Sequence, residues 1–200
     1  MRHPVVNKQD TRHESFENLA LPMMDELYGY ALRMSKNPTD AEDLVQETYL
    51  RAYRFFDSFE IGTNFRAWIF RILHNNFIDV FKRKKREDAS VELESNSPDV
   101  AHKSQNPAIS NMRTLQLDYT EIFDDAITRA LDKLPTDYRL VVLLSDVNGL
   151  KYKEIANIIR RPIGTVMSRL SRARKMLAKS LKPSAREYGI LRNTRVRQTL

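Results

Sequence analysis

The feature that most constrains this chain is a pair of short helical patterns in its last third, separated by a tight break. The first pattern spans residues 152–159 and the second spans residues 162–177. The apolar residues of the second pattern recur at helical spacing and form one stripe: Val166, Leu170, Ala173 and Leu177. Two helices joined by a short turn are typical of the helix-turn-helix motif, which can lay its second helix in the major groove of DNA.

The other face of the second pattern is polar and basic, and we expect it to point outward. It carries Ser168, Arg169, Arg172 and Lys175. From Ile155 to Arg186 the sequence contains neither Asp nor Glu. A basic helix face without compensating acid is poorly explained by folding, and contact with phosphate explains it well.

Positive charge is concentrated in two parts of the chain, whose formal net charge is +7. Residues 1–86 carry a net charge of +2, residues 87–117 carry −3, and residues 118–200 carry +8. A second basic cluster is the run of five cations at residues 82–86. Two separated basic patches predict contact with a polyanion at two places.

Several functional classes are excluded or disfavoured. The absence of cysteine excludes disulfides, thiolate zinc sites and cysteine nucleophiles. Residues 1–10 are too polar for a signal peptide, and no apolar run approaches ~20 residues. The four histidines are isolated, and the acidic cluster at residues 40–47 fits a helix start, where carboxylates favour the dipole. We expect a soluble cytoplasmic protein without membrane insertion, catalytic residues, cofactor or metal.

Helical periodicity dominates, so the predicted fold class is all-α, with two small helical domains joined by a flexible linker. We expect an N-terminal domain over residues 15–86, an acidic linker over 87–117, a C-terminal helix-turn-helix domain over 118–182 and a basic tail over 183–200. The N-terminal helices are expected at residues 19–34, 39–56 and 65–85, the second opened by a capping box from Thr39 to Glu42. Helices at residues 122–134 and 139–146 are expected before the helix-turn-helix.

The basic run at residues 82–86 follows a stretch rich in aromatic and amide side chains. This stretch includes Asn64, Phe65, Trp68, Arg71, Asn75 and Asn76. Aromatic rings stack on unpaired bases, amides read base edges, and lysines hold the phosphate backbone. Core packing competes with base contact for Phe65 and Trp68, and we expect it for Trp68.

These motifs resemble the extracytoplasmic-function (ECF, group IV) sigma factors of the sigma-70 family, the two-domain promoter-recognition subunits of bacterial RNA polymerase. The resemblance lies in residues 37–53 and 65–86 of the N-terminal half and in residues 130–135 and 152–177 of the C-terminal half. Two independent motifs in the right order make it specific. Residues 60–64 and 162–169 are most similar to the subgroup that answers thiol oxidation under a zinc-containing anti-sigma partner. Without cysteine here, redox sensing would have to lie in that partner.

The resemblance implies binding to core RNA polymerase (β′ clamp helices and β flap) and to promoter DNA, hence transcription initiation in a stress response under an anti-sigma factor. The residues implied to bind core polymerase are Asp43, Gln46, Glu47 and Leu50. Those implied to bind the −10 element are Asn64, Phe65, Arg71, Asn75, Lys82, Arg83 and Lys85, with the loop at residues 61–65 capturing a flipped base. Those implied to bind the −35 element are Thr165, Ser168, Arg169, Arg172 and Lys175.

The chain departs from the family pattern in the turn of the helix-turn-helix. Arg160 and Arg161 stand where glycine or another small residue is usual, and a left-handed Arg160 costs on the order of 1–2 kcal/mol. Lys151 stands where a capping Ser or Thr is common, a loss of roughly 1 kcal/mol. Either phosphate contact offsets the strain or the turn has another geometry.

Three other functions compete with this interpretation. A stand-alone helix-turn-helix regulator explains residues 130–180 equally well but leaves residues 40–86 without a role, and no heptad seam for a dimer is evident. A sigma-like decoy for an anti-sigma protein has little reason to keep the basic run and the arginine face. An enzyme lacks any supporting constellation of residues.

Overall fold

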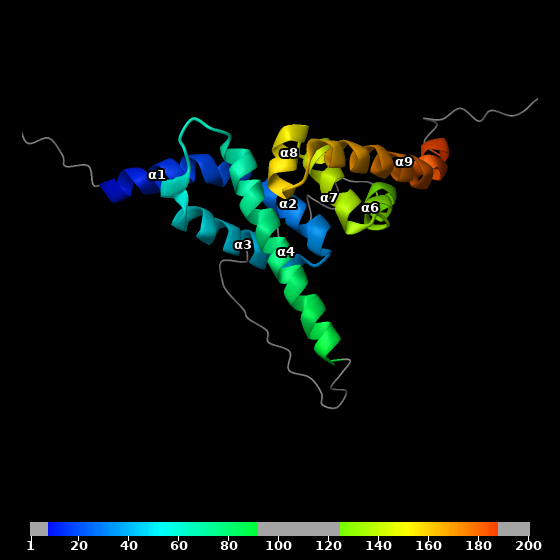
Figure 1. Ribbon diagram of the computed structural model, residues 1–200, viewed down its shortest axis with the longest axis horizontal. Helices are drawn as coiled ribbons and strands as arrows, with labels where there is room; N and C mark the ends of the chain where they lie inside the picture. Colours follow the sequence, from blue (N-terminus) through cyan, green and yellow to red (C-terminus); the bar gives the residue numbers. More distant parts are fainter. Residues whose placement is uncertain (1–7, 92–124, 188–200) are drawn as a thin grey trace, which may run out of the picture.

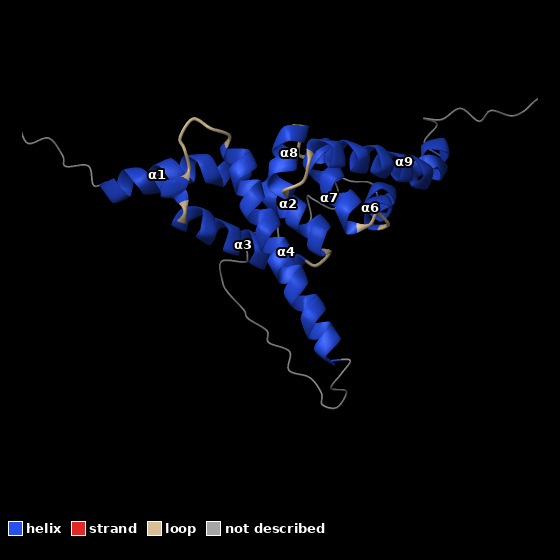
Figure 2. Cartoon of the chain, viewed as in Figure 1, coloured by secondary structure: helices blue, strands red, loops and turns tan. Residues whose placement is uncertain are grey.

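The computed structural model describes residues 8–91 and 125–187, and within these ranges all regular secondary structure is helical, with short loops and turns between the helices (Figures 1 and 2). This confirms the all-α class with a helix-turn-helix in the C-terminal part. Most of the predicted linker and of the basic tail lies outside the described residues. Within the described ranges no helix is both long and apolar enough to cross a lipid bilayer.

The N-terminal unit is built from four α-helices and two short 3-10 turns. These are α1 (Lys8–Ala20), η1 (Leu21–Met23), α2 (Met24–Ser35), α3 (Pro38–Arg54), η2 (Phe56–Ser58) and α4 (Phe65–Val91). The predicted single helix over residues 19–34 is wrong, because the chain turns at Leu21–Met23 between α1 and α2. Pro22 lies in this turn, where its missing N–H removes a helical hydrogen bond. Helix α4 runs six residues past its predicted end at Lys85.

The start of α3 differs from the predicted capping box. The Asn37 side chain accepts hydrogen bonds from the backbone N–H groups of Thr39, at 2.9 Å, and Asp40, at 3.3 Å. Asn37 is therefore the N-cap, and Pro38 takes the first helical position, where it has no N–H to satisfy. The predicted cap at Thr39 was placed two residues too late.

Aromatic rings hold the N-terminal unit together. Phe16 of α1 packs edge-on against Phe56, with ring centroids 5.3 Å apart, and Phe59 packs edge-on against Phe65 at 5.2 Å. Trp68 packs on Phe59 and Phe65 and is partly buried, which confirms core packing for this residue. These contacts fix the start of α4 and the loop before it against α1.

The C-terminal unit contains α6 (Asp125–Asp132), α7 (Thr136–Val142), a π-helical turn η4 (Leu143–Val147), α8 (Tyr152–Ile159) and α9 (Ile163–Glu187). In α9 the predicted stripe is confirmed. Val166, Leu170 and Ala173 are fully buried, and Leu177 packs partly buried against the same core. Helix α9 is longer than predicted and passes through Pro183.

The turn between α8 and α9 adopts the strained geometry considered for it. Arg160 has φ 51° and ψ 50°, in the left-handed region that non-glycine residues rarely occupy. The backbone N–H groups of Arg160 and Arg161 both donate to the carbonyl of Ala156, which closes the end of α8. These bonds offset part of the strain, and the side chains of both arginines are exposed.

The two units pack against each other, mainly through α4 with α8 and α2 with α7 (Figure 1). Among the described residues, three hydrogen bonds cross the contact, together with an ion pair between Lys36 and Asp132 at 3.3 Å. Arg139 donates to the carbonyl of Arg33 at 3.2 Å, Lys36 to that of Asp132 at 3.1 Å, and the Asn64 amide to Glu154 at 2.6 Å. We call this the closed arrangement.

Candidate nucleic-acid and polymerase-binding surfaces

The exposed face of α3 brings together all four residues predicted to bind core polymerase. Asp43, Gln46, Glu47 and Leu50 are exposed and line one shallow cleft of about 540 Å³ with residues of α4. Leu50 keeps 59% of its surface in solvent. An exposed leucine among carboxylates is typical of a protein interface, where an apolar anchor lies inside a polar rim.

The residues predicted to bind the −10 element lie along α4, but in different surroundings. Arg71, Lys82 and Arg83 are exposed, whereas Asn75 is half-buried. Phe65 is only 7% exposed and packs among the aromatic rings, so its ring is not available to a base in this structure. The backbone of Lys85 belongs to α4, but its side chain lies outside the described residues.

Asn64 has a structural role that the sequence did not reveal. Its side-chain oxygen accepts a hydrogen bond from the backbone N–H of Ala67 at 3.0 Å and so caps α4. Its amide donates to Glu154 of the C-terminal unit. The preceding loop projects into solvent: Ile61 is 78% exposed and Gly62 has φ +94°, a conformation that favours glycine.

The residues predicted to bind the −35 element lie in the first half of α9. Ser168, Arg172 and Lys175 are exposed, and Thr165 is half-buried. Arg169 does not point freely outward as expected, because its guanidinium forms an ion pair with Asp137 of α7 and is partly buried. Three of the five predicted side chains therefore form an exposed polar face.

Two arginines that the sequence analysis did not single out fix the C-terminal unit. Arg174 forms a two-pronged ion pair with Asp146, at 3.0 Å and 2.6 Å, which holds the pKa of Asp146 below its usual value. Arg139 is 5% exposed and donates to the carbonyls of Leu131, Asp132, Leu134 and Arg33. The sequence does contain a signal for Arg139, because this arginine stands in a largely apolar helical segment.

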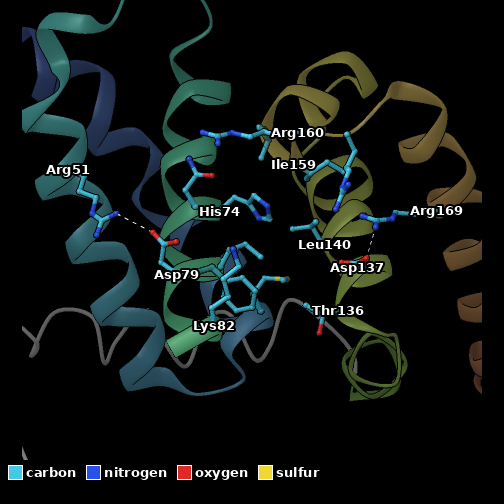
Figure 3. Close-up of a pocket in the computed structure, with 16 residues that line it drawn as sticks. Arg51, His74, Asp79, Lys82, Thr136, Asp137, Leu140, Ile159, Arg160 and Arg169 are labelled. Carbon is cyan, nitrogen blue, oxygen red and sulfur yellow. Dashed lines mark hydrogen bonds and ion pairs between the residues drawn. The ribbon is translucent and has the colours of Figure 1, made fainter. Parts of the chain in front are cut away.

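The closed arrangement turns the middle of α4 toward the C-terminal unit. Asn75 of α4 and Arg169 of α9 line the same cleft, and Arg160 extends across it toward α4 (Figure 3). His74 lies beside them on α4 and points toward the C-terminal unit, and it is only 7% exposed. Part of the surface predicted to read the −10 element is therefore covered in this form.

Burial of His74 predicts a loss of stability in mild acid. Burial lowers the pKa of this imidazole to about 4, against an opposing effect of Asp137. As the pH falls, the unfolded chain takes up the proton first. The contribution of neutral His74 to the free energy of unfolding is therefore fully present above about pH 6.5 and decreases between pH 6.5 and pH 4. The full loss is about 3 kcal/mol for this pKa difference.

Chemical denaturation at a series of pH values measures this effect. We expect His74→Gln to flatten the stability profile between pH 6.5 and 4, whereas His13→Gln, at an exposed histidine of α1, leaves it unchanged. If the free energy of unfolding depends on pH with the same slope in the parent and in both variants, His74 is not responsible for the loss of stability in acid.

Comparison with known proteins places both units in one family. The family Sigma-70 region 2 matches residues 20–87, and Sigma-70, region 4 matches residues 124–177. The ECF RNA polymerase sigma factor EcfG of Rhodopseudomonas palustris is 37% identical over 165 residues, which cover 82% of this chain and 84% of EcfG. The ECF RNA polymerase sigma factor SigE of Mycolicibacterium smegmatis is 34% identical over 166 residues, which cover 82% of this chain and 60% of SigE.

Solved structures agree with these matches. The sigma factor RpoE of Bartonella quintana, in complex with the anti-sigma factor NepR, is 31% identical with a TM-score of 0.63 and covers 85% of this chain and 96% of its own. CnrH, in complex with the cytosolic domain of CnrY, has a TM-score of 0.59 at 24% identity, which shows the shared fold. The order of the two regions, the exposed basic face of α9 and these matches show that the chain belongs to the ECF RNA polymerase sigma factors of the sigma-70 family.

Proposed function

We propose that three surfaces divide the work of this sigma factor. The exposed face of α3 binds the β′ clamp helices of core RNA polymerase, α4 and the loop before it bind the −10 element, and the exposed face of α9 binds the −35 element. The C-terminal unit also contacts the β flap. The observation that carries the proposal is the placement of the acidic α3 face and the basic α9 face on separate units, both open to solvent.

The proposed residue roles follow the structure. Arg71 and Asn75 contact the −10 bases, with Lys82, Arg83 and Lys85 on the backbone and the loop at residues 61–64 receiving a flipped base. Phe65 supports that loop from the core rather than touching DNA. On the −35 element, Ser168, Arg172 and Lys175 contact DNA directly, and Thr165 and Arg169 join them once Arg169 leaves Asp137.

Core polymerase has to separate the two units, because the closed arrangement covers Asn75 and engages Asn64. We propose that core polymerase opens this contact by binding the separated form more tightly than the closed one. Each DNA contact alone is weak, and fixing both on one polymerase raises their effective concentration.

We further propose that an anti-sigma factor restrains this protein in the cytoplasm. The solved relative RpoE is bound to the anti-sigma factor NepR, which supports a partner of this kind. The thiol-oxidative subgroup stays a prediction from residues 60–64 and 162–169. Because the chain contains no cysteine, a response to a thiol oxidant has to enter through the partner, and induction of the target promoter by such an oxidant tests it.

Run-off transcription from a randomised promoter library tests the function directly. Core RNA polymerase with the chain should yield transcripts that core alone does not, sharing two sequence blocks at fixed spacing. If nothing initiates but the chain alone shifts duplex DNA at a palindromic site, a stand-alone regulator explains the helix-turn-helix instead.

Replacement of Arg172 by alanine tests the −35 surface. If its side chain reaches a base, we expect a loss of about 1–3 kcal/mol at the recovered promoter, which is roughly 5- to 150-fold, with relaxed preference at one −35 position. The matched control is Lys179→Ala, an exposed cation two turns further along α9. An unchanged promoter preference in Arg172→Ala would move the reading face to another part of the helix.

A further inference from the structure

A cleft of about 680 Å³ lies between the two units (Figure 3). One wall comes from α2, α3 and α4, and the other from α7, the end of α8 with the turn after it, and the first turns of α9. Small-molecule sites commonly have volumes of about 300–1,000 Å³. This cleft therefore has room for a small ligand but not for a DNA duplex.

The charges that line this cleft do not balance. Its carboxylates, Asp79 and Asp137, are each paired with a lining arginine: Asp137 with Arg169, and Asp79 at 3.8 Å with Arg51, which pairs more closely with Glu47 outside the cleft. Three further cations line the cleft, and no ion pair forms between them and any other described residue: Lys82, Arg160 and Arg161. Lys82 lies on the N-terminal wall and the two arginines on the opposite wall, so the closed arrangement places uncompensated cations on both walls of one cleft.

A buried polar atom in the same cleft also lacks a partner. The Nδ1 atom of His74 is buried and makes no hydrogen bond to the described part of the chain. The imidazole lines the cleft and points toward the C-terminal wall (Figure 3). Buried polar atoms are nearly always satisfied, by protein, water or ligand. At neutral pH this imidazole is uncharged, so it offers one N–H donor and one acceptor.

We propose that this cleft binds a small polyphosphate anion, which bridges the two units of the closed arrangement. Arginine presents a planar fork of donors that matches phosphate oxygens, and lysine adds a point charge. A chain of phosphates is longer than a single phosphate and is therefore better able to contact Lys82 on one wall and Arg160 and Arg161 on the other. Free polyphosphate and the triphosphate of a nucleotide share this chemistry.

This ligand would hold the sigma factor in the form that covers Asn75. An anion that binds both walls binds the closed arrangement more tightly than the open one, because opening separates the cations it neutralises. Its binding therefore shifts the population toward the closed form and lowers the amount available to DNA and polymerase. The binding site itself concerns the free protein, whereas the effect on DNA and polymerase rests on the proposed function.

Calorimetric titration of the full chain with sodium tripolyphosphate, at about 0.15 M salt, tests the site. We expect one saturable site, no measurable binding of orthophosphate, and at least a tenfold loss of affinity in Lys82→Gln and in the double variant Arg160→Asn with Arg161→Gln. Asparagine is chosen because it tolerates the left-handed conformation of residue 160. Titration with ATP distinguishes a nucleotide from free polyphosphate as the ligand, because ATP can bind more tightly than tripolyphosphate only if the protein also contacts the nucleoside.

The matched control is the double variant Lys179→Ala with Lys182→Ala, which removes two exposed cations of α9 outside the cleft. It should bind tripolyphosphate as the parent does. Equal affinities for cleft and control variants, or many weak sites, would overturn the proposal and leave general attraction to a basic protein.

Closure is measured separately by energy transfer between dyes on Asn18→Cys and Ser171→Cys, two exposed positions on different units of a chain without native cysteine. Tripolyphosphate should raise the transfer in the parent but not in Lys82→Gln. Saturable binding without any change in transfer would overturn the bridging role. Neither assay contains polymerase or promoter DNA, so a failure here is distinct from a failure of the proposed promoter contacts.

Discussion

Replacing Asp43 and Glu47 together with lysine is expected to abolish co-purification of this sigma factor with core RNA polymerase. Both carboxylates lie on the exposed face of α3 beside Leu50. If α3 binds polymerase as proposed, these carboxylates face complementary groups of the partner, and reversing both charges costs several kcal/mol. We expect affinity for core enzyme to fall by at least about 4 kcal/mol, or a thousandfold.

The fold should survive this change. The ion pair lost within the chain, from Glu47 to Arg51, is an exposed pair one turn apart on the helix, and such pairs contribute about 0.3–0.5 kcal/mol. The matched control carries the same charge change elsewhere, as Glu14→Lys with Asp25→Lys on α1 and α2. Leu50→Ala should weaken binding without any change of charge. Undiminished co-purification of the α3 variant would remove this face from the interface.

Replacing Arg139 with methionine is expected to unfold much of the C-terminal unit at physiological temperature. This guanidinium is buried and donates to four carbonyls, two at the end of α6, one in the turn that follows and one near the end of α2. Hydrogen bonds to charged groups contribute about 1.5–3 kcal/mol each. The carbonyls of Leu131 and Asp132 keep a second donor, the N–H of Leu134 and the ammonium of Lys36, whereas the carbonyl of Leu134 loses its buried bond to the guanidinium. We expect the free energy of unfolding to fall by at least about 3 kcal/mol.

Thermal unfolding followed by circular dichroism measures this loss. For a domain of this size, about 1 kcal/mol shifts the Tm by roughly 4–8 °C, so the expected shift exceeds about 10 °C. The Tm of Arg139→Lys should lie between those of the parent and the methionine variant, because one ammonium group does not reach all four carbonyls. Arg129→Met, at an exposed arginine of α6, is the matched control. A Tm for Arg139→Met within about 2 °C of the parent would show that water satisfies these carbonyls.

The parts of the fold that depend on local pattern were predictable. The buried stripe of α9 and the exposed α3 face each follow from residue types a few positions apart, whereas the left-handed Arg160 was one of two geometries left open. The two wrong helix boundaries also have local causes. Pro22 breaks the helix predicted over residues 19–34, and Asn37 caps α3 two residues before the predicted cap at Thr39.

The parts that depend on distant pairs were not predictable. Arg169 was expected to face outward because helical spacing places it off the apolar stripe, but its partner Asp137 lies 32 residues earlier. The closed arrangement likewise depends on pairs such as Asn64 with Glu154, 90 residues apart, which no periodicity encodes. The candidate polymerase and −35 faces were thus largely visible in the sequence, whereas the covering of the −10 face was not.

The separation along the chain of the residues that join the two units also determines when the closed arrangement first forms in a cell. Its three hydrogen bonds connect residues 90, 96 and 106 positions apart, all from the first half of the chain to the second. Ribosomes add about 5–20 residues per second, and helical units with local contacts fold far faster than that. For roughly 5–20 s of synthesis, the nascent N-terminal unit is therefore folded with the middle of α4 uncovered, and restraint by the C-terminal unit begins only once translation is nearly complete.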